Sequence, residues 1–278
     1  MNRNARGILF GIIAALGGSL IAHAGSLEPP LGPPGPTMKT LSEVEPRTPI
    51  RNDFDGLNPV VITQPGSYYL VEDIYAYPDE HGIEIQSSHV TLDLNGFSVI
   101  GNLEVGSRSG IYADAGGGYM NIQVRNGTVR SFSDSGVSLD QSPFARIENV
   151  RALDNGLDGT GLGIWVGPHA RIIDCVAAGN LQTGISANVG SVITGSIATD
   201  NHVGISFNGV VDFSTAWGNG TTGILGATTS LVVHSTAGQN GGTGILSTTG
   251  LQLGNAASDN TTDLDNPGGL SVDNYDGP

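Results

Sequence analysis

Residues 163–207 read GIWVGPHARIIDCVAAGNLQTGISANVGSVITGSIATDNHVGISF, and this stretch holds the same pattern three times. Each copy opens on Gly-Ile, at Gly163, Gly184 and Gly204, so the copies follow one another after 21 and 20 residues. An Ala-x-x-Asn segment stands between successive copies. Self-similarity at a fixed period of this length is typical of a solenoid, in which every repeat forms one turn stacked on the next.

The pattern continues on both sides of this stretch. The Gly-Ile dipeptide, once replaced by Gly-Val, occurs with intervals of 28, 26, 27, 21, 20, 19 and 21 residues, at Gly82, Gly110, Gly136, Gly163, Gly184, Gly204, Gly223 and Gly244. Each dipeptide opens a short alternating stretch, such as Ile83-Glu84-Ile85, which is the period-two pattern of a β-strand. No helical pattern fits within so short a repeat. The sequence therefore predicts an all-β fold, a parallel β-helix of about eight rungs.

Equivalent residues of stacked turns form columns along a solenoid. The Ala-x-x-Asn segment recurs at Ala152/Asn155, Ala177/Asn180, Ala198/Asn201, Ala216/Asn219, Ala237/Asn240 and Ala257/Asn260. We expect the Ala column to point inward, and the Asn column to adopt the left-handed backbone conformation and bond the next turn through its amides. Cys175 shares a column with Ser196, Ser214 and Ser235, which favours a small inward residue and not a nucleophile.

Composition excludes several function classes. The chain has 278 residues with 26 acidic and 11 basic side chains, a net charge of −15. Such a balance argues against nucleic acid and against anionic membrane surfaces as partners. The single cysteine excludes an internal disulfide framework. His169, His202 and His234 fall in different columns and show no zinc-ligand spacing. No phosphate-binding or dinucleotide motif occurs, so no cofactor is implied.

Residues 1–24 have the pattern of a secretory signal peptide. Arg3 and Arg6 precede an uncharged apolar stretch, and Ala22-His23-Ala24 has the small-x-small form of a cleavage site. A membrane anchor is the alternative, but the apolar stretch is shorter than the roughly 20 residues that span a bilayer. We therefore expect a secreted or periplasmic protein with no membrane insertion after cleavage.

Three further segments follow. Residues 25–57 form a proline-rich linker, because the density of proline prevents both helix and strand pairing. Residues 58–265 form the β-helix, in which residues 58–75 read as a strand pair that caps the first rung. Residues 266–278 form an acidic tail that blocks end-to-end stacking. Calcium binding is an alternative role for these carboxylates, although the spacing matches no known calcium loop.

Two segments carry a resemblance to a known family. His89-Val90-Thr91-Leu92-Asp93-Leu94-Asn95-Gly96-Phe97, followed by Asn121-Ile122-Gln123-Val124-Arg125-Asn126-Gly127-Thr128, resembles secreted bacterial right-handed parallel β-helix repeat proteins of the pectate-lyase-like superfamily. The resemblance covers roughly residues 36–265 and implies a right-handed β-helix. This fold hosts lyases, hydrolases, epimerases and inert scaffolds, so the resemblance specifies function poorly.

The resemblance implies candidate catalytic residues. Polygalacturonase-like members place acidic residues and a histidine on neighbouring rungs, and here Asp134, Asp158 and His202 partly match that pattern. The Asp-Asp, Gly-His-Gly and Arg-x-Lys motifs of those enzymes are missing, and His202 stands one rung late. Two carboxylates roughly 5 to 9.5 Å apart would suit glycoside hydrolysis. The alternative is that both aspartates are solvated loop residues.

Other residues are candidates for substrate binding. Arg146 and Arg171 occupy one column and are placed to neutralise a carboxylate, as a lyase requires, although a surface network of arginines and acids is the alternative. Tyr112, Asp114 and Trp165 lie in the longer, irregular repeats, and Trp165 faces outward if Ile164 and Val166 face inward. Trp165 can then stack on a sugar ring.

Together these features predict an exported β-helix protein that binds extracellular polysaccharide on one face of the solenoid. Processing of the bound polysaccharide is a further part of this hypothesis. A noncatalytic structural or adhesive surface scaffold is the alternative, because the regular last rungs have no insertions to wall a cleft. Neither reading requires a cofactor, except for calcium as a bridge between the acidic chain and an acidic glycan. The sequence does not indicate an oligomeric state.

Overall fold

The structure, a computed structural model, describes residues 46–52, 60–102, 108–157 and 159–277. Residues 45–278 form one unit. The predicted signal peptide, most of the predicted linker and Asp158 lie outside the described residues. In the described part of the chain, no helix is long and apolar enough to cross a membrane.

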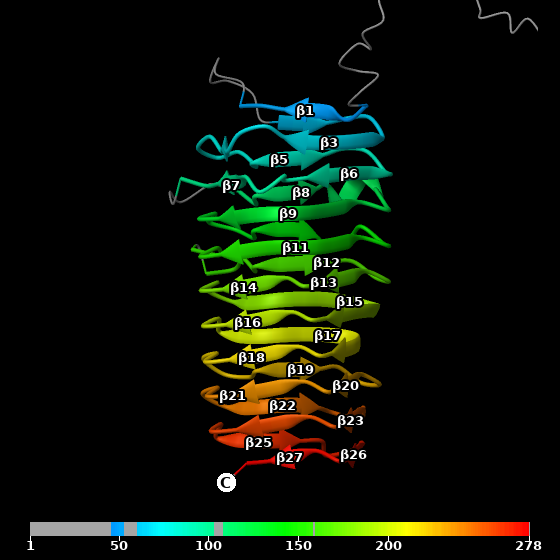
Figure 1. The fold of residues 1–278 in the computed structure, drawn as a ribbon, viewed down its shortest axis with the longest axis vertical. Coiled ribbons are helices and arrows are strands. Elements are labelled where there is room, and N and C mark those ends of the chain that lie inside the picture. The colour runs from blue at the N-terminus through cyan, green and yellow to red at the C-terminus, as the bar shows by residue number, and fades with distance from the viewer. Residues whose placement is uncertain (1–45, 53–59, 103–107, 158, 278) are drawn as a thin grey trace, which may run out of the picture. The chain divides into compact units, whose positions relative to one another are not determined.

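The described unit is a parallel β-helix of about ten turns, each built from up to three short strands (Figure 1). Strands of successive turns pair in parallel and form three sheets, which we name A, B and C in the order in which a turn passes through them. The predicted parallel β-helix is confirmed, with two turns more than expected. The count of Gly-Ile dipeptides did not include these two turns, because their strands, Val60-Val61-Ile62 and Thr262-Asp263-Leu264-Asp265, form without the dipeptide.

Sheet A consists of β2 (Val60–Ile62), β5 (Ile83–Ile85), β8 (Ile111–Ala113), β10 (Val137–Leu139), β12 (Ile164–Val166), the first parts of β15 (Thr183–Thr194) and β17 (Val203–Asp212), β19 (Ile224–Gly226), β22 (Thr243–Ser247) and β25 (Thr262–Asp265). Sheet B consists of β1 (Thr48–Ile50), β3 (Gly66–Leu70), β6 (Val90–Asp93), the first parts of β9 (Gln123–Arg130) and β11 (Arg146–Leu153), β13 (Arg171–Ile173), the last parts of β15 and β17, β20 (Leu231–Val233), β23 (Leu251–Leu253) and β26 (Leu270–Val272). Sheet C consists of β4 (Ile74–Tyr75), β7 (Ser98–Ile100), the last parts of β9 and β11, β14 (Val176–Ala178), β16 (Ile197–Thr199), β18 (Thr215–Trp217), β21 (Thr236–Gly238), β24 (Ala256–Ser258) and β27 (Tyr275–Asp276). One short helix, η1 (Ala115–Gly117), follows β8.

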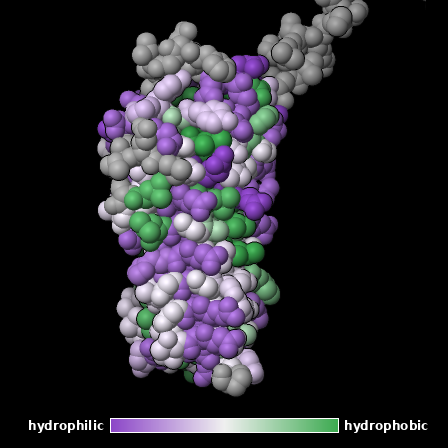
Figure 2. All heavy atoms as spheres, turned by 90° about the vertical axis from the view of Figure 1, so that its left-hand side faces the viewer, coloured by the Kyte–Doolittle hydropathy of each residue, from purple (hydrophilic) through white to green (hydrophobic). Residues whose placement is uncertain are grey.

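The interior is filled by columns of aliphatic side chains. In sheets A and B these are mainly isoleucine, leucine and valine, which alternate with outward residues along each strand. In sheet C the inward column from Ala152 to Ala257 is alanine in six successive turns, and all six are buried. The predicted inward Ala stack is therefore confirmed. Hydrophilic residues dominate the side of the unit shown in Figure 2, where hydrophobic residues form small separate groups.

The Asn column forms the predicted ladder between sheets C and A. The backbone N–H and the side-chain Nδ2 of Asn180 both donate to Oδ1 of Asn201, each at 2.9 Å. The same arrangement continues from Asn155 to Asn260, so it satisfies turn amides that have no other partner. The ladder residues are not left-handed, contrary to expectation. The residue before each of them is left-handed instead, as at Asp154 (φ 52°) and Asp200 (φ 55°).

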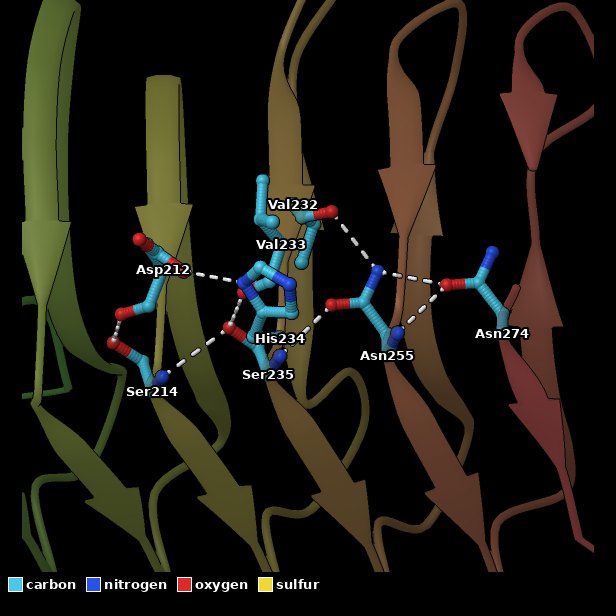
Figure 3. Close-up of polar contacts among 8 residues, drawn as sticks. All are labelled: Asp212, Ser214, Val232, Val233, His234, Ser235, Asn255 and Asn274. Carbon is cyan, nitrogen blue, oxygen red and sulfur yellow. Dashed lines mark hydrogen bonds and ion pairs between the residues drawn. The ribbon is translucent and has the colours of Figure 1, made fainter. Parts of the chain in front are cut away.

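A second ladder lies at the corner between sheets B and C. The backbone N–H of Ser214 donates to Ser235 Oγ at 3.2 Å, and that of Ser235 donates to Asn255 Oδ1 at 2.9 Å (Figure 3). Cys175 begins this column, donates its backbone N–H to Ser196 Oγ, and is buried. Its buried position is the predicted inward one. Burial also raises the pKa of the Cys175 thiol to about 11, so the thiol is protonated near neutral pH.

The structure extends the β-helix at both ends. Thr48–Ile50, in the predicted linker, pairs with β3, and β2 and β3 pair in parallel with β5 and β6 as an ordinary turn and not as a cap. Residues 266–277, predicted as a tail, contain β26 and β27, which pair with β23 and β24. The alternation Leu270-Ser271-Val272 and the bond from Asn255 N–H to Asn274 Oδ1 continue the repeat there, since they meet the preceding turn in register.

Candidate functional site

The outer face of sheet A carries a column of polar and aromatic side chains in its first turns. Glu84, Tyr112, Ser138 and Trp165 occupy the same position of β5, β8, β10 and β12. Each stands between two buried aliphatic residues, so alternation directs it outward. Trp165 therefore faces outward as predicted. Tyr112 and Trp165 lie two turns apart, roughly 10 Å along the axis.

Ser138 lies between these two aromatic residues and is only 5% exposed, whereas Tyr112 and Trp165 are partly exposed. Their rings thus frame a short strip of sheet A. An aromatic side chain offers a flat apolar face together with a polar edge, which suits contact with a sugar ring. We name this strip, formed by Glu84, Tyr112, Ser138 and Trp165, the aromatic strip.

A buried histidine supports the upper end of the aromatic strip. The ring of His81 stacks on that of Tyr112, with centroids 4.0 Å apart and an interplanar angle of 1°. His81 is 7% exposed, and burial lowers its pKa below the usual value of 6.5. The backbone N–H of Ser109 donates to His81 Nδ1 at 3.2 Å, which assigns the proton of the neutral ring to Nε2. The stack therefore holds Tyr112 in one orientation.

Asp134 joins the same group through Ser109. The buried Ser109 hydroxyl donates to Asp134 Oδ2 at 2.8 Å, and Ser135 Oγ donates to Asp134 Oδ1 at 3.3 Å. Ser109 thus bridges His81 and Asp134. The chain Tyr112, His81, Ser109 and Asp134 crosses neighbouring turns at the corner where the chain enters sheet A. Asp134 is placed as a positioned acceptor beside the strip.

The predicted catalytic residue His202 does not assemble with Asp134. His202 and Asp134 occupy the same corner position, because each stands three residues before the first inward residue of its sheet A strand. His202 lies three turns after Asp134, however, so the two residues are roughly 14 Å apart along the axis. It is exposed, and its backbone bonds to Gln182 and Thr221. Asp158 lies outside the described residues, so the predicted carboxylate pair stays a prediction. His202 and Asp134 cannot act on one bond across this distance.

Asp114 lies at the end of β8, on the far side of the strand from Asp134. It is exposed, and its carboxylate Oδ1 accepts the Gly116 N–H at 3.0 Å at the start of η1. This is an N-cap contact and shapes the turn after β8. Asp114 borders the aromatic strip and leaves its second carboxylate oxygen toward solvent.

Arg146 and Arg171 lie in register on neighbouring strands, as predicted, but on sheet B. The aromatic strip belongs to sheet A, so the two groups of predicted substrate-binding residues face different sides. Arg146 pairs with Glu148 of its own strand at 3.0 Å, which is the surface network that the sequence left open as an alternative. A carboxylate at the strip is therefore not reached by these two guanidinium groups.

No group of three or more His, Cys, Asp or Glu side chains within the described ranges has a geometry that could hold a metal ion. The expectation of calcium stays a prediction.

The sequence reasoning missed His81 and Ser109. Both were readable from the repeat, because each directly precedes a Gly-Ile dipeptide, at Gly82 and Gly110, and so occupies one column with Ser135. Nothing in the sequence indicated that the His81 ring turns toward Tyr112.

The fold and the columns define a class of protein, the single-chain β-solenoids built on stacked parallel sheets. The chain belongs to the right-handed β-helix family, because the family model described as a right handed beta helix region matches residues 61–210. The predicted right-handed β-helix is thereby confirmed. A search of curated proteins finds no match.

Solved structures show the same fold at low identity. A pectate lyase, Pel9A, superposes with a TM-score of 0.56 at 15% identity, over 76% of this chain and 67% of its own. The A-module of the mannuronan C-5 epimerase AlgE4 from Azotobacter vinelandii superposes with a TM-score of 0.56 at 18% identity, over 74% of this chain and 62% of its own. These similarities concern the fold alone.

Proposed function

We propose that this protein binds polysaccharide along the aromatic strip of sheet A. The observation that carries the proposal is the register of Tyr112 and Trp165, which places two aromatic rings in one outward column with only the small Ser138 between them. The His81 stack pre-orients Tyr112, which lowers the entropy cost of binding. Both similar structures are named as enzymes that act on polysaccharides, which supports the ligand class.

A neutral glycan suits the strip better than an acidic one. The chain carries a net charge of −15. The acidic side chains at the strip are Glu84, Asp114 and Asp134, and they outnumber Arg108, the cation that lies near His81. Anionic polymers are repelled by such a surface unless cations bridge them. Processing of the glycan stays a separate prediction, which rests on Asp134 and Asp158 for a hydrolase and on Arg146 and Arg171 for a lyase. We further propose that the protein is exported, on the basis of residues 1–24.

A noncatalytic structural or adhesive scaffold remains the second candidate function. The observation that favours it is the regular stacking of the turns after β12, where Asn155 to Asn260 form an unbroken ladder. Such turns make a stiff rod. The two functions differ in whether a soluble glycan is bound at the strip.

The chain offers a direct test, since it contains only two tryptophans on different sheets. Trp165 belongs to the strip, and Trp217 lies on sheet C with its ring over Gly238. We would titrate the variants Trp217→Phe and Trp165→Phe with neutral and acidic polysaccharides and follow tryptophan emission. Binding at the strip predicts a saturable change in Trp217→Phe, which keeps Trp165, and weaker binding by Trp165→Ala. The matched control Trp217→Ala retains the affinity.

The same samples decide between the candidate functions. New reducing ends or unsaturated products that disappear in Asp134→Asn would add an enzymatic activity to the binding. A protein that stays folded and shows no emission change with any glycan would overturn the proposal in favour of the scaffold. Export is tested by the N-terminal sequence of protein recovered from the periplasm or the medium, which we expect to begin at Gly25.

A further inference from the structure

A second surface feature lies at the corner between sheets B and C, away from the aromatic strip. It is a hollow of about 380 Å³ lined by Gly96, Asn126, Gly127, Thr128, Asn149 and Arg151. The residues come from three successive turns, and Thr128 and Arg151 are in register on β9 and β11. Asn126 and Asn149 are the left-handed corner residues of these two strands, with φ of 61° and 52°.

Glycine makes room for the hollow. At Gly96, a Cβ would have no atom within 4 Å, so the rim is open there. The backbone at Gly127 approaches the turn before it closely, since a Cβ at this position would lie 2.5 Å from the Phe97 carbonyl oxygen. The floor of the hollow is therefore main chain, and its functional groups are those of Asn149, Thr128 and Arg151.

The side chains around the hollow divide into engaged and available groups. Asn149 Nδ2 donates to Asn126 Oδ1 at 3.3 Å, and Asn126 Nδ2 donates to Asp93 Oδ1 at 3.1 Å. This chain fixes both amides. The side chain of Arg151, by contrast, is exposed and makes no hydrogen bond or ion pair with the described residues. Its guanidinium keeps its full set of donors for a ligand.

The charges beside the hollow favour an anion. The one buried carboxylate next to it, Asp93, pairs with Arg125 at 3.0 Å and with Arg47 at 3.4 Å, so two cations meet one anion. Glu148, the neighbour of Asn149, pairs with Arg146 at 3.0 Å. Asp174 stands at the same corner of the next turn, in register with Asn149, and adds one carboxylate. With Arg151, four guanidinium groups stand against three carboxylates here.

The surroundings concentrate positive charge in an otherwise acidic chain. Five of the ten arginines lie on sheets B and C between β9 and β13, namely Arg125, Arg130, Arg146, Arg151 and Arg171. No lysine or arginine follows Arg171 in the sequence. The hollow lies within this concentrated group.

We propose that this hollow binds a single oxyanion group, a carboxylate or a sulfate-type ester, through Arg151. A guanidinium meets two oxygens of such a group with parallel N–H donors, and this geometry is the reason arginine recognises oxyanions. The Thr128 hydroxyl and the remaining acceptor of Asn149 border the same space and suit hydroxyl groups on the ligand. The site is separate from the aromatic strip, and its existence does not depend on the proposed function.

The test is an NMR titration of the full-length protein with sulfate, acetate, glucuronate and glucose at matched ionic strength. We expect saturable shifts of the backbone amides of Gly127, Thr128 and Arg151 with the anions, and none with glucose. The amides of β8 and β12 report on the aromatic strip, so binding there is read independently. Sodium chloride should weaken the anion effect, because an exposed charge is screened by salt.

Arg151→Gln is the decisive variant, and Arg130→Gln is its matched control. Arg130 lies on the same strand as Thr128, is exposed, and does not line the hollow. Loss of the charge-assisted bonds should weaken binding roughly tenfold or more in Arg151→Gln, while Arg130→Gln retains it. Unchanged HSQC spectra elsewhere in Arg151→Gln would show that the fold is intact.

Each outcome bears on the proposal. Tighter binding of glucuronate than of acetate would identify a saccharide-borne acid as the ligand, and equal binding of sulfate and acetate would identify the free anion. Absence of saturable shifts with all three anions would overturn the proposal. Equal weakening in Arg130→Gln and Arg151→Gln would also overturn it, because the effect would then be net charge and not the hollow.

Discussion

The two halves of this β-helix differ in how the corners between their sheets bond to the next turn. In the C-terminal half, residues 172–277, polar ladders bond every corner between sheets C and A and between sheets B and C to the next turn. In the N-terminal half, residues 60–171, the Asn column ends at Asn155, whose Oδ1 accepts the N–H of Phe132 in the turn before it. Phe132 replaces asparagine there and is fully buried.

The difference is also one of length and charge. The Gly-Ile intervals are 28, 26 and 27 residues in the N-terminal half and 19 to 21 afterwards. In the column of sheet B that carries Arg146 and Arg171, the next residues are Val192, Val210, Leu231, Leu251 and Leu270. The repeated ladders make the turns of the C-terminal half uniform. In the N-terminal half the corners differ from turn to turn, which leaves room for the buried ring of Phe132, the aromatic strip and the hollow at Arg151. Candidate sites are therefore concentrated in the irregular half.

The largest expected effect concerns the corner of the N-terminal half. Phe132→Ala removes a fully buried ring that packs beneath Gly82 and Gly110, and should lower the free energy of unfolding by about 3–5 kcal/mol. Urea unfolding followed by circular dichroism measures this. Phe144→Ala, which truncates a phenylalanine that is 55% exposed, is the control and should cost far less. Equal losses would contradict the role of Phe132 as a corner core.

Asn201→Ala tests the ladder of the C-terminal half. It leaves the backbone N–H of Asn180 without its acceptor inside the protein, whereas Asn180 Nδ2 keeps the Ala152 carbonyl. The variant also loses the bond from Asn201 Nδ2 to the Ala177 carbonyl, and should cost about 2–3 kcal/mol in all. Asn188→Ala, which removes a single bond to the Asp140 carbonyl, is the matched control and should cost about 1 kcal/mol or less. Equal losses of stability in Asn201→Ala and Asn188→Ala, measured by thermal unfolding, would contradict a stabilising role of the ladder.

The free energy of unfolding should depend on pH through His81, which lies in the N-terminal half. Its pKa is lowered in the folded state, so the unfolded chain takes up the proton first when the pH falls below about 6.5. The stability that neutral His81 provides is therefore complete above that pH and declines on acidification. Between about pH 7.5 and about pH 5.5, His81→Gln should lose less stability than the wild type. A steeper decline in His81→Gln would refute the buried neutral histidine.

The smallest effect is expected for Cys175→Ser, which extends the serine ladder by one turn toward the N-terminal half. Ser196, Ser214 and Ser235 already occupy this column, so the change should alter stability by about 1 kcal/mol or less. In the wild type, the thiol with a pKa of about 11 should react with a maleimide only as the protein unfolds. Fast labelling of the native protein would show that this corner opens.

The regular half was largely predictable from the sequence. A repeat of near-constant length stacks identical residues, so the inward Ala152 to Ala257 column, the Asn ladder and the place of Cys175 could be derived by counting. The outward direction of Trp165 followed from strand alternation. The strands Thr48–Ile50 and Leu270–Val272 were missed because these segments lack the repeated dipeptide. The left-handed conformation was assigned to the ladder Asn and not to the residue before it.

The sequence by itself determined that this protein is a parallel β-helix with a net charge of −15 and a column of small residues along sheet C. Only the tertiary structure decided which side chains meet across turns of unequal length. It places His81 against Tyr112, joins Asp134 to Ser109, assigns Arg146 and Arg171 to another sheet than Trp165, and opens the hollow at Arg151. The physical reason is that the repeat period specifies the register of the strands, whereas the path of each corner depends on contacts with the turns stacked on either side.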